Sequence, residues 1–584
     1  MLQIKKSIAA VLHGEVLAAC PDAALDQDSL ATWLEYPPDA NMGDLAFPCF
    51  KLSKIMRRSP VQIASLLAEK VVALCDCVES AENVNGYLNM RIKGADLIGR
   101  VLPEILSKGE KYGAPDFGEG KTVVLDYSSP NLAKPFHVGH LGTTVIGHAL
   151  KKLHEFAGYK CVGINYVGDW GTQFGKLIVA YKKWGDRKTV EEGGVDALVD
   201  LYVKINNAIS GNEEMGITAD PALAAEARAE FLKMEQGDEE NLALWKWLVQ
   251  MSLNANEETY KQLGITFDSY KGESFYTDKM PAQIEKLRAQ NLLTISDGAS
   301  IVDLSDYKMP PCLILKSDGA SLYPARDIAA AVERKETYNY DKMIYVTAAQ
   351  QSLHFAQWFK VVELMGYDWY DQLVHVPYGM VSINGAKLAT RTGNVVLLRD
   401  LFAAAIEKVR QIMDEKNPDL PNKDEAAEAV GVGAIVFYYL SNNRIKDINF
   451  NMEDALSYDG NTGPYVQYTY ARTCSVMNKA AAAGCTTDAD FAAYTLCAQE
   501  SELLKTLSRF GECVLGAIRD LEPSEITRYI LDVAAAFNRF YHDCSILSAE
   551  DETTRAFRVA LTAATRTVLG NAFELICLRK IEQI

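Results

Sequence analysis

Short apolar runs alternate with helical runs from Lys121 to Pro421, and this alternation limits the folds open to the chain. The apolar runs resemble buried strands, and the segments between them repeat apolar residues with helical spacing. Strands that alternate with helices predict a parallel sheet with right-handed crossovers, whose ligands gather at the carboxyl ends of the strands. The predicted strands lie in TVVLDY, CVGINYVGDW, SIVDLSD, CLILKS, KMIYVTA and LVHVPYGMV.

Three domains are expected, because 584 residues exceed the size of a single core. Residues 1–110 read as a mixed α+β region that ends in ENVNGYLNMRIKG, a hairpin or the edge of a sheet, and KGEKYGAPDFGEGKT reads as a linker. The α/β domain spans 118–421 and carries a helical, acidic insertion at about 185–263. Residues 424–584 read almost wholly as amphipathic helix.

Charge and cysteine content narrow the class of protein. The chain has 77 acidic and 59 basic residues, a net charge of −18, which disfavours indiscriminate binding to polyanions but leaves room for local basic patches. Its 12 cysteines include no CxxC pair, which indicates reduced thiols in a cytoplasmic protein and no zinc site. No apolar run reaches membrane-spanning length, and the N-terminal segment lacks the core of a signal peptide.

The stretch SSPNLAKPFHVGHLGTT places two histidines, His137 and His140, where a predicted strand turns into a helix. A helix N-terminus offers free N–H groups and a positive dipole end, which favour phosphate. We expect the imidazoles to donate to phosphate oxygens as they gain charge, with Lys134 and Asn131 on the same loop. Gly139 would let an adenine ring lie against the backbone. The alternative is that the histidines cap or pack the start of the helix.

A second polar loop follows a strand in VPYGMVSINGAKLATRTGN and carries Lys387, Thr390 and Arg391. Basic loops of this kind can close over a triphosphate and stabilise charge that develops at the phosphorus. The alternative for this loop alone is a solvated turn.

These two stretches carry a family resemblance. HVGH is similar to the HIGH signature of class I aminoacyl-tRNA synthetases, and AKLATRTGN resembles a degenerate KMSKS loop. Seven collinear strings, within about 36–578, together resemble the arginyl-tRNA synthetase family. They are SSPNLAKPFHVGHL, NYVGDWGTQFGKLI, ALWKWLVQMSL, FDSYKGESFY, KSDGASLYPARD, MIYVTAAQQSLHF and ALSYDGNTGPYVQYTYART.

The resemblance implies a Rossmann-like catalytic domain, an additional N-terminal domain and an all-α anticodon-binding domain. It implies a ligase that forms arginyl-adenylate from ATP and L-arginine, with Mg²⁺ accompanying ATP, and transfers the arginyl group to tRNA(Arg). Members often need bound tRNA before they activate the amino acid, and we expect this here. No zinc or organic cofactor is expected, and the enzyme is expected to be a cytoplasmic monomer.

Site residues follow from the resemblance, position by position. His137, His140, Lys134, Lys387 and Arg391 would act on the phosphates, and Asn131 and Gly139 would join the histidines at ATP. Glu273, Tyr323 and Asp327 would hold the guanidinium, whereas Asp126, Asn131 and Gln351 would hold the α-amino group. Carboxylates suit the guanidinium fork, and Tyr323 and Asp327 share a face if they lie on one helical turn. The alternative for each acid alone is a surface charge or helix cap.

Contacts with tRNA are expected in two places. Tyr465, Tyr468 and Arg472 are spaced to lie on one helical face, where rings and a guanidinium can stack with unpaired anticodon bases. The alternative is a tyrosine-rich core stripe. Tyr87 and Asn89 are the positions that the resemblance carries over for the D-loop region.

Three departures from the family pattern stand out. Gly142-Thr143 replaces a common Arg-Ser pair, Thr390 stands where the second lysine of the loop is expected, and the chain ends in LRKIEQI, which makes an anticodon contact by the last residues doubtful. We expect Lys134 to substitute for the absent lysine. Two rivals stay open: another class I synthetase of glutamyl or cysteinyl type, which Glu273 and Asp327 disfavour, and a synthetase-like RNA-binding protein without catalysis.

Overall fold

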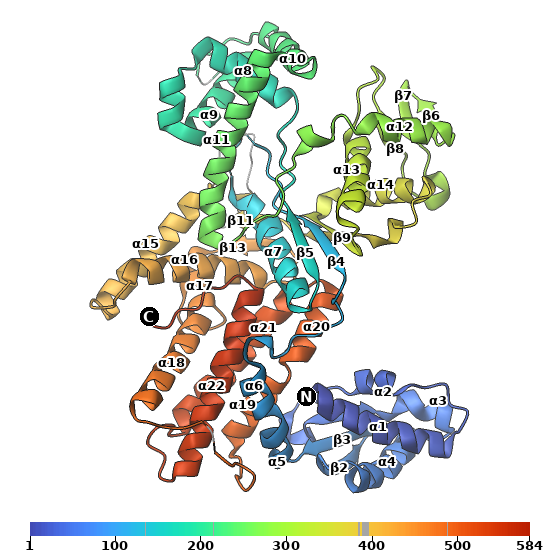
Figure 1. The fold of residues 1–584 in the computed structure, drawn as a ribbon, viewed down its shortest axis with the longest axis vertical. Coiled ribbons are helices and arrows are strands. Elements are labelled where there is room, and N and C mark those ends of the chain that lie inside the picture. Colours follow the sequence, from blue (N-terminus) through green and yellow to red (C-terminus); the bar gives the residue numbers. More distant parts are fainter. Residues whose placement is uncertain (133, 135, 214, 384–385, 388–395, 488) are drawn as a thin grey trace.

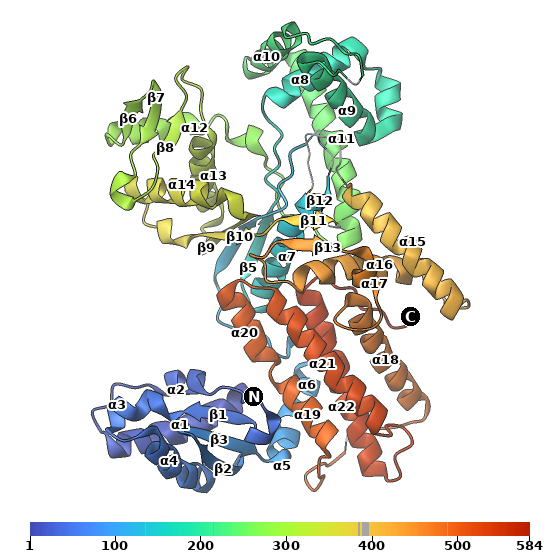
Figure 2. The same ribbon diagram turned by 180° about the vertical axis from the view of Figure 1, so that it is seen from behind.

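The computed structural model describes residues 1–584 except 133, 135, 214, 384–385, 388–395 and 488. A small sheet lies at the centre of the molecule, two lobes project beyond one end of it, and a bundle of helices lies at the other end (Figure 1). The N-terminal domain lies beside the far end of this bundle, as Figure 2 shows from behind.

Four parallel strands form the central sheet, in the order β10-β9-β4-β5. The inner strand β4 reads as a continuous apolar run, and its Val123, Val124 and Leu125 are fully buried, as expected for a strand flanked on both edges. The predicted parallel sheet is confirmed. Its strands are β4 (Thr122–Asp126), β5 (Lys160–Ile164), β9 (Lys342–Ala348) and β10 (Leu373–Tyr378), and the helices beside them are α7 (Leu141–Phe156), α13 (Tyr323–Tyr338) and α14 (Ser352–Leu364).

Two predicted strands belong to a different sheet. SIVDLSD and CLILKS contribute to β7 (Ala299–Val302) and β8 (Cys312–Leu315), which join β6 (Leu293–Ser296) in antiparallel pairing beside α12 (Met280–Ala289). Asp297 and Gly298 both have positive φ between β6 and β7, the geometry of a two-residue hairpin turn. The prediction that SIVDLSD and CLILKS belong to the parallel sheet is therefore wrong: their strands pair antiparallel. A two-residue turn such as that between β6 and β7 can connect only antiparallel neighbours.

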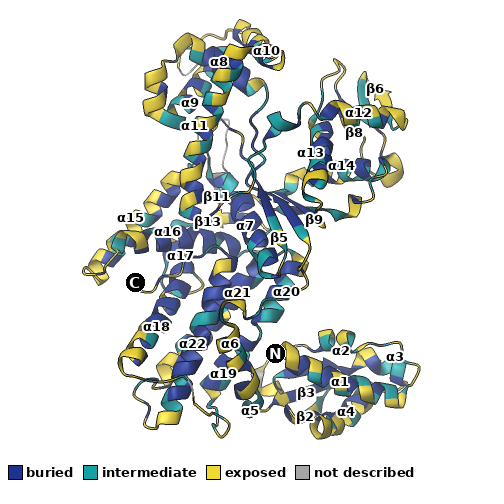
Figure 3. Ribbon diagram, in the orientation of Figure 1, coloured by how far each residue is buried: buried dark blue, intermediate teal, exposed yellow. Residues whose placement is uncertain are grey.

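Four helices form a separate lobe after β5, which we call the helical lobe (Figure 1). Its helices begin at Thr172, earlier than the predicted 185. The Asp186 side chain caps α9 by accepting a hydrogen bond from the backbone N–H of Thr189. In Figure 3 the outer helices of this lobe carry many exposed residues, whereas the central sheet is largely buried. The lobe comprises α8 (Thr172–Trp184), α9 (Arg187–Ser210), α10 (Ala222–Glu235) and α11 (Glu239–Leu263).

The C-terminal helices pack around α22, which contacts α18, α19 and α21. Phe557, Leu561 and Val568 of α22 are fully buried, as its central place requires. The segment comprises α15 (Leu398–Lys416), α16 (Lys423–Leu440), α17 (Met452–Leu456), α18 (Gly463–Ala482), α19 (Ala498–Ser508), α20 (Phe510–Asp520), α21 (Ser524–Asp543) and α22 (Glu552–Leu575). A small sheet, β11 (Val381–Ile383), β12 (Ala386–Lys387) and β13 (Ile448–Phe450), joins it to the α/β domain.

The N-terminal domain combines helices with an antiparallel sheet of order β1-β3-β2. Asn85 and Gly86, both with positive φ, turn β2 into β3, so the predicted hairpin is confirmed. The elements are α1 (Leu2–Ala19), α2 (Gln27–Trp33), β1 (Leu45–Pro48), α3 (Ser53–Met56), α4 (Pro60–Leu74), β2 (Val78–Val84), β3 (Tyr87–Ile92), α5 (Gly94–Asp96) and α6 (Leu102–Lys108). Across the described part of the chain, no helix combines the length and apolarity needed to cross a bilayer.

Candidate functional site

The two histidines lie at the corner between β4 and α7, where His137 caps a single turn of 3-10 helix, Val138–His140, that precedes α7. Their imidazole rings have centroids 4.0 Å apart and planes tilted by 37°. The backbone N–H of His137 donates to Nδ1 of His140 at 3.1 Å, and the backbone N–H of Gly139 donates to Nδ1 of His137 at 3.0 Å. Both Nδ1 atoms are therefore acceptors.

This bonding pattern determines the protonation of the rings. An imidazole whose Nδ1 accepts carries its proton on Nε2, so both residues present Nε2–H donors. Burial lowers the pKa of His140 to about 3, and burial followed by the charge of Lys134 lowers the pKa of His137. The two half-buried rings are thus neutral donors of Nε2–H, which is what donation to phosphate oxygens requires, and that contact stays a prediction.

The His137 ring requires a glycine at position 139. A Cβ there would lie 2.7 Å from the His137 ring, so the glycine leaves room for that ring. The contact with adenine therefore stays a prediction without support from this geometry. Asn131 and Lys134 are exposed on the preceding loop, and Asn131 pairs with Gly168 through a backbone bridge, which joins this loop to the one after β5.

The second predicted phosphate loop is anchored beside the same corner. Lys387 ends β12, which pairs with β11, whereas Thr390 and Arg391 lie outside the described residues. Where the chain is described again, the carbonyl of Val396 accepts from the backbone N–H of Val138 at 3.1 Å. Both ends of the loop are thereby held within the α/β domain, and its far end is bonded to the histidine turn.

Gly142, one of the departures from the family pattern, has a structural reason. A Cβ at this position would lie 2.2 Å from the Tyr439 hydroxyl and 3.0 Å from the Tyr378 ring. Tyr439 lies on α16, so a helix of the C-terminal segment fills the space that a larger side chain would need. Thr143 is buried and links Ser128 to β9 by accepting from the Ser128 N–H and donating to the Val346 carbonyl.

The predicted carboxylates gather at the carboxyl ends of the strands. Asp126 ends β4, is 5% exposed, and pairs with Nη1 of Arg334 at 2.8 Å. Burial raises the pKa of Asp126, although Arg334 opposes the shift. Arg334 is itself only 1% exposed and lies between the rings of Tyr166, Tyr276 and Tyr345.

Glu273 and Asp327 also have partners within the chain. Glu273 Oε2 pairs with Nη1 of Arg326 at 2.9 Å, and Asp327 Oδ2 contacts Nε2 of His354 at 2.6 Å. The backbone N–H of Glu273 donates to the carbonyl of Val167, next to Gly168, which links the carboxylates to the phosphate corner. Burial raises the pKa of Glu273 to about 7 against the effect of Arg326.

The other two predicted arginine ligands are open to solvent. Tyr323 begins α13, one turn before Asp327, and is 67% exposed. Gln351 is exposed just before α14. The structure thus brings Asp126, Glu273 and Asp327 together and leaves Tyr323 and Gln351 at the rim. The partner arginines, Arg326 and Arg334, were missed from the sequence, although Arg326 stands inside the LYPARD motif.

The predicted anticodon face lies on α18. The Arg472 guanidinium lies 4.9 Å from the ring centroid of Tyr468 and 4.7 Å from that of Tyr541. Tyr468 and Tyr541 are 45% and 41% exposed, and both line a cavity of about 510 Å³. Tyr465 is half-buried, and its hydroxyl accepts from Asn538 at 3.0 Å. The exposure of Tyr468 argues against the alternative that these tyrosines serve only as a stripe of core residues.

The sequence reading missed two parts of this cavity. Tyr541 comes from α21. In the sequence it is only an aromatic residue near the end of an amphipathic helix, which does not by itself predict a place in this cavity. The final residues Glu582, Gln583 and Ile584 also line the cavity, so the doubt about the last residues finds no support in their position.

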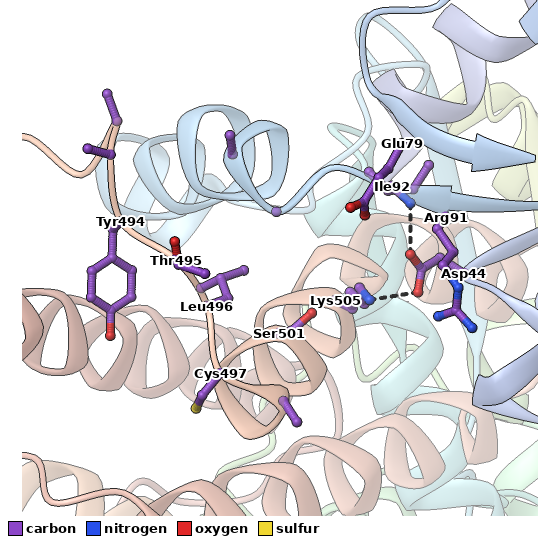
Figure 4. Close-up of a pocket in the computed structure, with 15 residues that line it drawn as sticks. Asp44, Glu79, Arg91, Ile92, Tyr494, Thr495, Leu496, Cys497, Ser501 and Lys505 are labelled. Atoms are coloured by element: carbon purple, nitrogen blue, oxygen red, sulfur yellow. Dashed lines mark hydrogen bonds and ion pairs between the residues drawn. The ribbon is translucent and has the colours of Figure 1, made fainter. Parts of the chain in front are cut away.

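A second cavity, of about 540 Å³, lies between the N-terminal domain and α19 (Figure 4). Asp44 and Lys505 form an ion pair of 2.7 Å across it, and Arg91 and Glu79 add one charge of each sign. This balance does not favour phosphate. Of the two predicted D-loop residues on β3, Tyr87 is half-buried against Phe50, whereas Asn89 is 5% exposed. Asn89 lies on the face of β3 opposite the core residues Leu88 and Met90, and its contact with RNA stays a prediction.

One group of possible metal ligands occurs among the described residues: Cys497, Glu500 and Cys544. Arg558 Nε lies 2.8 Å from Glu500 Oε1, and the backbone N–H of Cys497 donates to the other carboxylate oxygen. A carboxylate already neutralised by a guanidinium disfavours a cation there. The expected absence of zinc stays a prediction.

The chain matches three families of domain. Residues 101–452 match tRNA synthetases class I (R), catalytic domain, residues 466–584 match the DALR anticodon binding domain, and residues 2–92 match the arginyl tRNA synthetase N terminal domain.

Known proteins resemble the chain over nearly its whole length. The arginine–tRNA ligase of Alkaliphilus metalliredigens is 48% identical over 560 residues, 96% of this chain and 97% of the relative. That of Clostridioides difficile is 48% identical over 562 residues, with the same coverage. The arginyl-tRNA synthetase structure from Thermus thermophilus has the same fold, with a TM-score of 0.82 at 24% identity over 100% of this chain and 99% of that chain. This chain therefore belongs to the arginyl-tRNA synthetase family of class I aminoacyl-tRNA synthetases.

Proposed function

We propose that the protein joins L-arginine to tRNA(Arg) in two steps at the expense of ATP. One observation carries the proposal: neutral imidazole donors and a group of carboxylates meet at the carboxyl ends of parallel strands, in a chain of this family. That edge of a parallel sheet is where α/β proteins bind their ligands. The family match and the near-complete coverage by arginine–tRNA ligases support the choice of arginine and tRNA.

The first step forms arginyl-adenylate. A carboxylate oxygen of arginine attacks the α-phosphorus of Mg²⁺·ATP and forms a new P–O bond. The bond from the α-phosphorus to the bridging oxygen breaks, and pyrophosphate leaves with that oxygen and the electron pair. Nε2–H of His137 and Nε2–H of His140 donate to phosphate oxygens as charge builds there, and Lys134, Lys387 and Arg391 supply positive charge. Such preorganised donors account for much of the rate of reactions of this type.

Arginine is held by charge and planarity. Glu273 and Asp327 accept from its guanidinium with Tyr323 at the rim, while Asp126, Asn131 and Gln351 face the α-amino group. A lysine ammonium is a point charge that cannot satisfy two carboxylates in the plane of a fork. The grouping of carboxylates also disfavours a glutamyl or cysteinyl specificity.

The second step transfers the arginyl group to RNA. A hydroxyl of the terminal ribose attacks the carbonyl carbon, and AMP leaves. Tyr468 and Arg472 with Tyr465, on α18, would read the anticodon, and Tyr87 would face the D-loop region. We propose that tRNA must bind before arginine is activated, and that the enzyme acts as a cytoplasmic monomer. The role of the family in translation supports the location.

The test is tRNA charging with each of the twenty amino acids, together with ATP–pyrophosphate exchange in the presence and absence of tRNA. Charging with arginine alone, and exchange that needs tRNA, would agree with the proposal. Charging with another amino acid would assign the chain to a different specificity. RNA binding without exchange or charging would favour the rival without catalysis.

A further inference from the structure

Two carboxylates assigned to the substrate are already paired with arginines of the chain itself. Arg334 pairs with Asp126, and Arg326 pairs with Glu273; both arginines lie on α13. The two pairs differ in accessibility. Arg334 and Asp126 have side chains only 1% and 7% exposed, whereas Arg326 and Glu273 are 16% and 17% exposed. A ligand can therefore reach the second pair more readily than the first.

Carboxylates outnumber cations around Glu273. Asp169 and Asp327 both lie close enough to raise the pKa of Glu273, and Arg326 is the cation that opposes them. Ser274 holds Asp169 through its backbone N–H at 2.8 Å and through its hydroxyl. Three carboxyl groups lie close to one guanidinium, so oxygen acceptors are left over for a second guanidinium from a substrate.

We propose that Arg326 is a positioning residue for arginine recognition, which holds the Glu273 side chain in place through Oε2 so that its other oxygen can accept from the substrate guanidinium. This inference rests on the proposed arginine specificity and assigns a residue to it that the family match did not supply. The ion pair uses Oε2 of Glu273, and a carboxylate has a second oxygen that can accept from another guanidinium.

The surroundings explain why Glu273 needs such a partner. Burial raises the pKa of Glu273 to about 7 even with Arg326 beside it. The groups that face it are Arg326 and Asp327 from α13, and Asp169 and Tyr166 from the loop after β5; His354 of α14 acts through Asp327. Only Arg326 among these lowers the pKa of Glu273 directly, so its removal should raise that pKa further.

Arg326 has one further sign of a polar neighbour. Its Nε atom is buried, and no atom of the described residues accepts a hydrogen bond from it. A buried donor without a partner is costly, and water or a bound ligand commonly satisfies such a group. The guanidinium thus has a donor left over after its bond to Glu273.

The experiment compares four variants in ATP–pyrophosphate exchange with saturating ATP and tRNA: Arg326→Met, Arg326→Lys, Glu273→Gln and the double variant Arg326→Met with Glu273→Gln. KM for arginine and kcat are measured from pH 6.5 to 8.5. Arg288→Met is the matched control, since Arg288 is an exposed arginine that pairs with Glu285 on α12. Thermal unfolding of each variant establishes that it is folded.

We expect Arg326→Met to raise KM for arginine about tenfold relative to the parent at pH 6.5, and by much less at pH 8.5, because one unit in the pKa of Glu273 is worth a factor of about ten. Arg326→Lys should recover most of the parent profile. In the double variant, Arg326→Met should add little to Glu273→Gln, because Arg326 acts through Glu273. The control should follow the parent at every pH.

The outcomes separate this inference from the proposed function. If Glu273→Gln leaves KM for arginine unchanged, the arginine pocket itself is misplaced. If Glu273→Gln raises KM but the Arg326→Met profile superimposes on that of the parent, the pocket stands and the role of Arg326 is refuted. Additive effects in the double variant would equally refute it. Should Arg326→Met fail to fold, Arg326→Gln removes the same charge and provides the same comparison.

Discussion

His137 and His140 constrain each other: their rings lie 4.0 Å apart, and the backbone of the first donates to the ring of the second. Neither imidazole can turn without breaking that bond or the one from Gly139. The pair is therefore a preorganised donor of two N–H groups, with no charge of its own.

Substitution of His140 by two different amides tests this. The amide nitrogen of glutamine reaches about where Nε2 lies, whereas asparagine reaches only as far as Nδ1. His140→Asn should lose roughly 2.7–4 kcal/mol of transition-state stabilisation, the cost of removing a preorganised donor, and His140→Gln should lose clearly less. Pyrophosphate exchange at saturating substrates measures both. The reverse order would mean that His140 serves chiefly as a cap.

Lys134 is expected to replace the second lysine of the KMSKS loop, which is absent because position 390 is a threonine. Its charge already lowers the pKa of both histidines, which places it near their rings. Lys134→Ala should slow exchange by about a hundredfold to a thousandfold with little change in arginine or tRNA affinity, and adding Thr390→Lys should restore part of the rate. Lys188→Ala, at an exposed position of the helical lobe, is the control. Turnover of Lys134→Ala within about threefold of the parent would end the compensation hypothesis.

Asp327→Asn keeps the shape of the pocket and removes one charge. The amide oxygen can still accept from His354, so local structure should survive, while arginine binding should weaken by roughly 1.5–3 kcal/mol. The loss should appear in KM for arginine at saturating ATP. Asp278→Asn, at an acid just before α12 whose side chain is 77% exposed, should change nothing. An unaltered KM in Asp327→Asn would remove this residue from the pocket.

The cavity between α18 and α21 predicts a pair of stacking residues. Tyr468→Ala and Tyr541→Ala should each weaken tRNA binding by roughly 1–3 kcal/mol, with arginine and ATP parameters unchanged at saturating tRNA. Tyr307→Ala is a matched control, because Tyr307 is 44% exposed and lies between β7 and β8, away from this cavity. Earlier thermal unfolding with an unchanged KM for tRNA would instead return the two tyrosines to a packing role.

Stability should fall in mild acid. Burial lowers the pKa of His148 to about 3, and its Nδ1 lies 3.0 Å from the Tyr127 hydroxyl. Between that value and the unfolded pKa near 6.5, the unfolded chain binds the proton and the native one does not. The stabilising contribution is complete above 6.5 and falls as the pH drops, by about 2 kcal/mol between pH 7 and pH 5.

Urea unfolding of His148→Gln at the two pH values checks this. The variant should lose less stability than the parent on acidification, whereas His542→Gln, at a side chain 88% exposed, should behave like the parent. Equal losses in all three proteins would assign the acid sensitivity to other groups.

Much of this architecture follows from local patterns. The strand before His137 and the helix after His140 place the pair at a corner, and the segment ENVNGYLNMRIKG, predicted as a hairpin or the edge of a sheet, forms a hairpin that turns at Asn85-Gly86. Alternation could not separate parallel from antiparallel pairing, so β7 and β8 were assigned to the wrong sheet. The overlooked Asp297-Gly298 turn carried that information.

The site was less predictable because side-chain partners depend on folding. Family similarity identifies carboxylates by position, but it does not reveal that Arg326 and Arg334 neutralise two of them. The protonation of the histidines depends on backbone N–H directions that no spacing rule supplies. Tyr541 meets Arg472 only because α21 packs beside α18.

The fit of the Tyr439 hydroxyl against Gly142 makes α7 and α16 mechanical neighbours. α16 packs in turn on α18, where the exposed aromatic face lies, so a continuous stack of helices connects this aromatic face with the histidine corner. Coupling between two binding sites is reciprocal in free energy. If tRNA binding raises the affinity of the histidine corner for ATP and arginine through this stack, then ATP and arginine must raise the affinity for tRNA by the same factor. Binding of the RNA and binding of the small substrates are then a single coupled equilibrium.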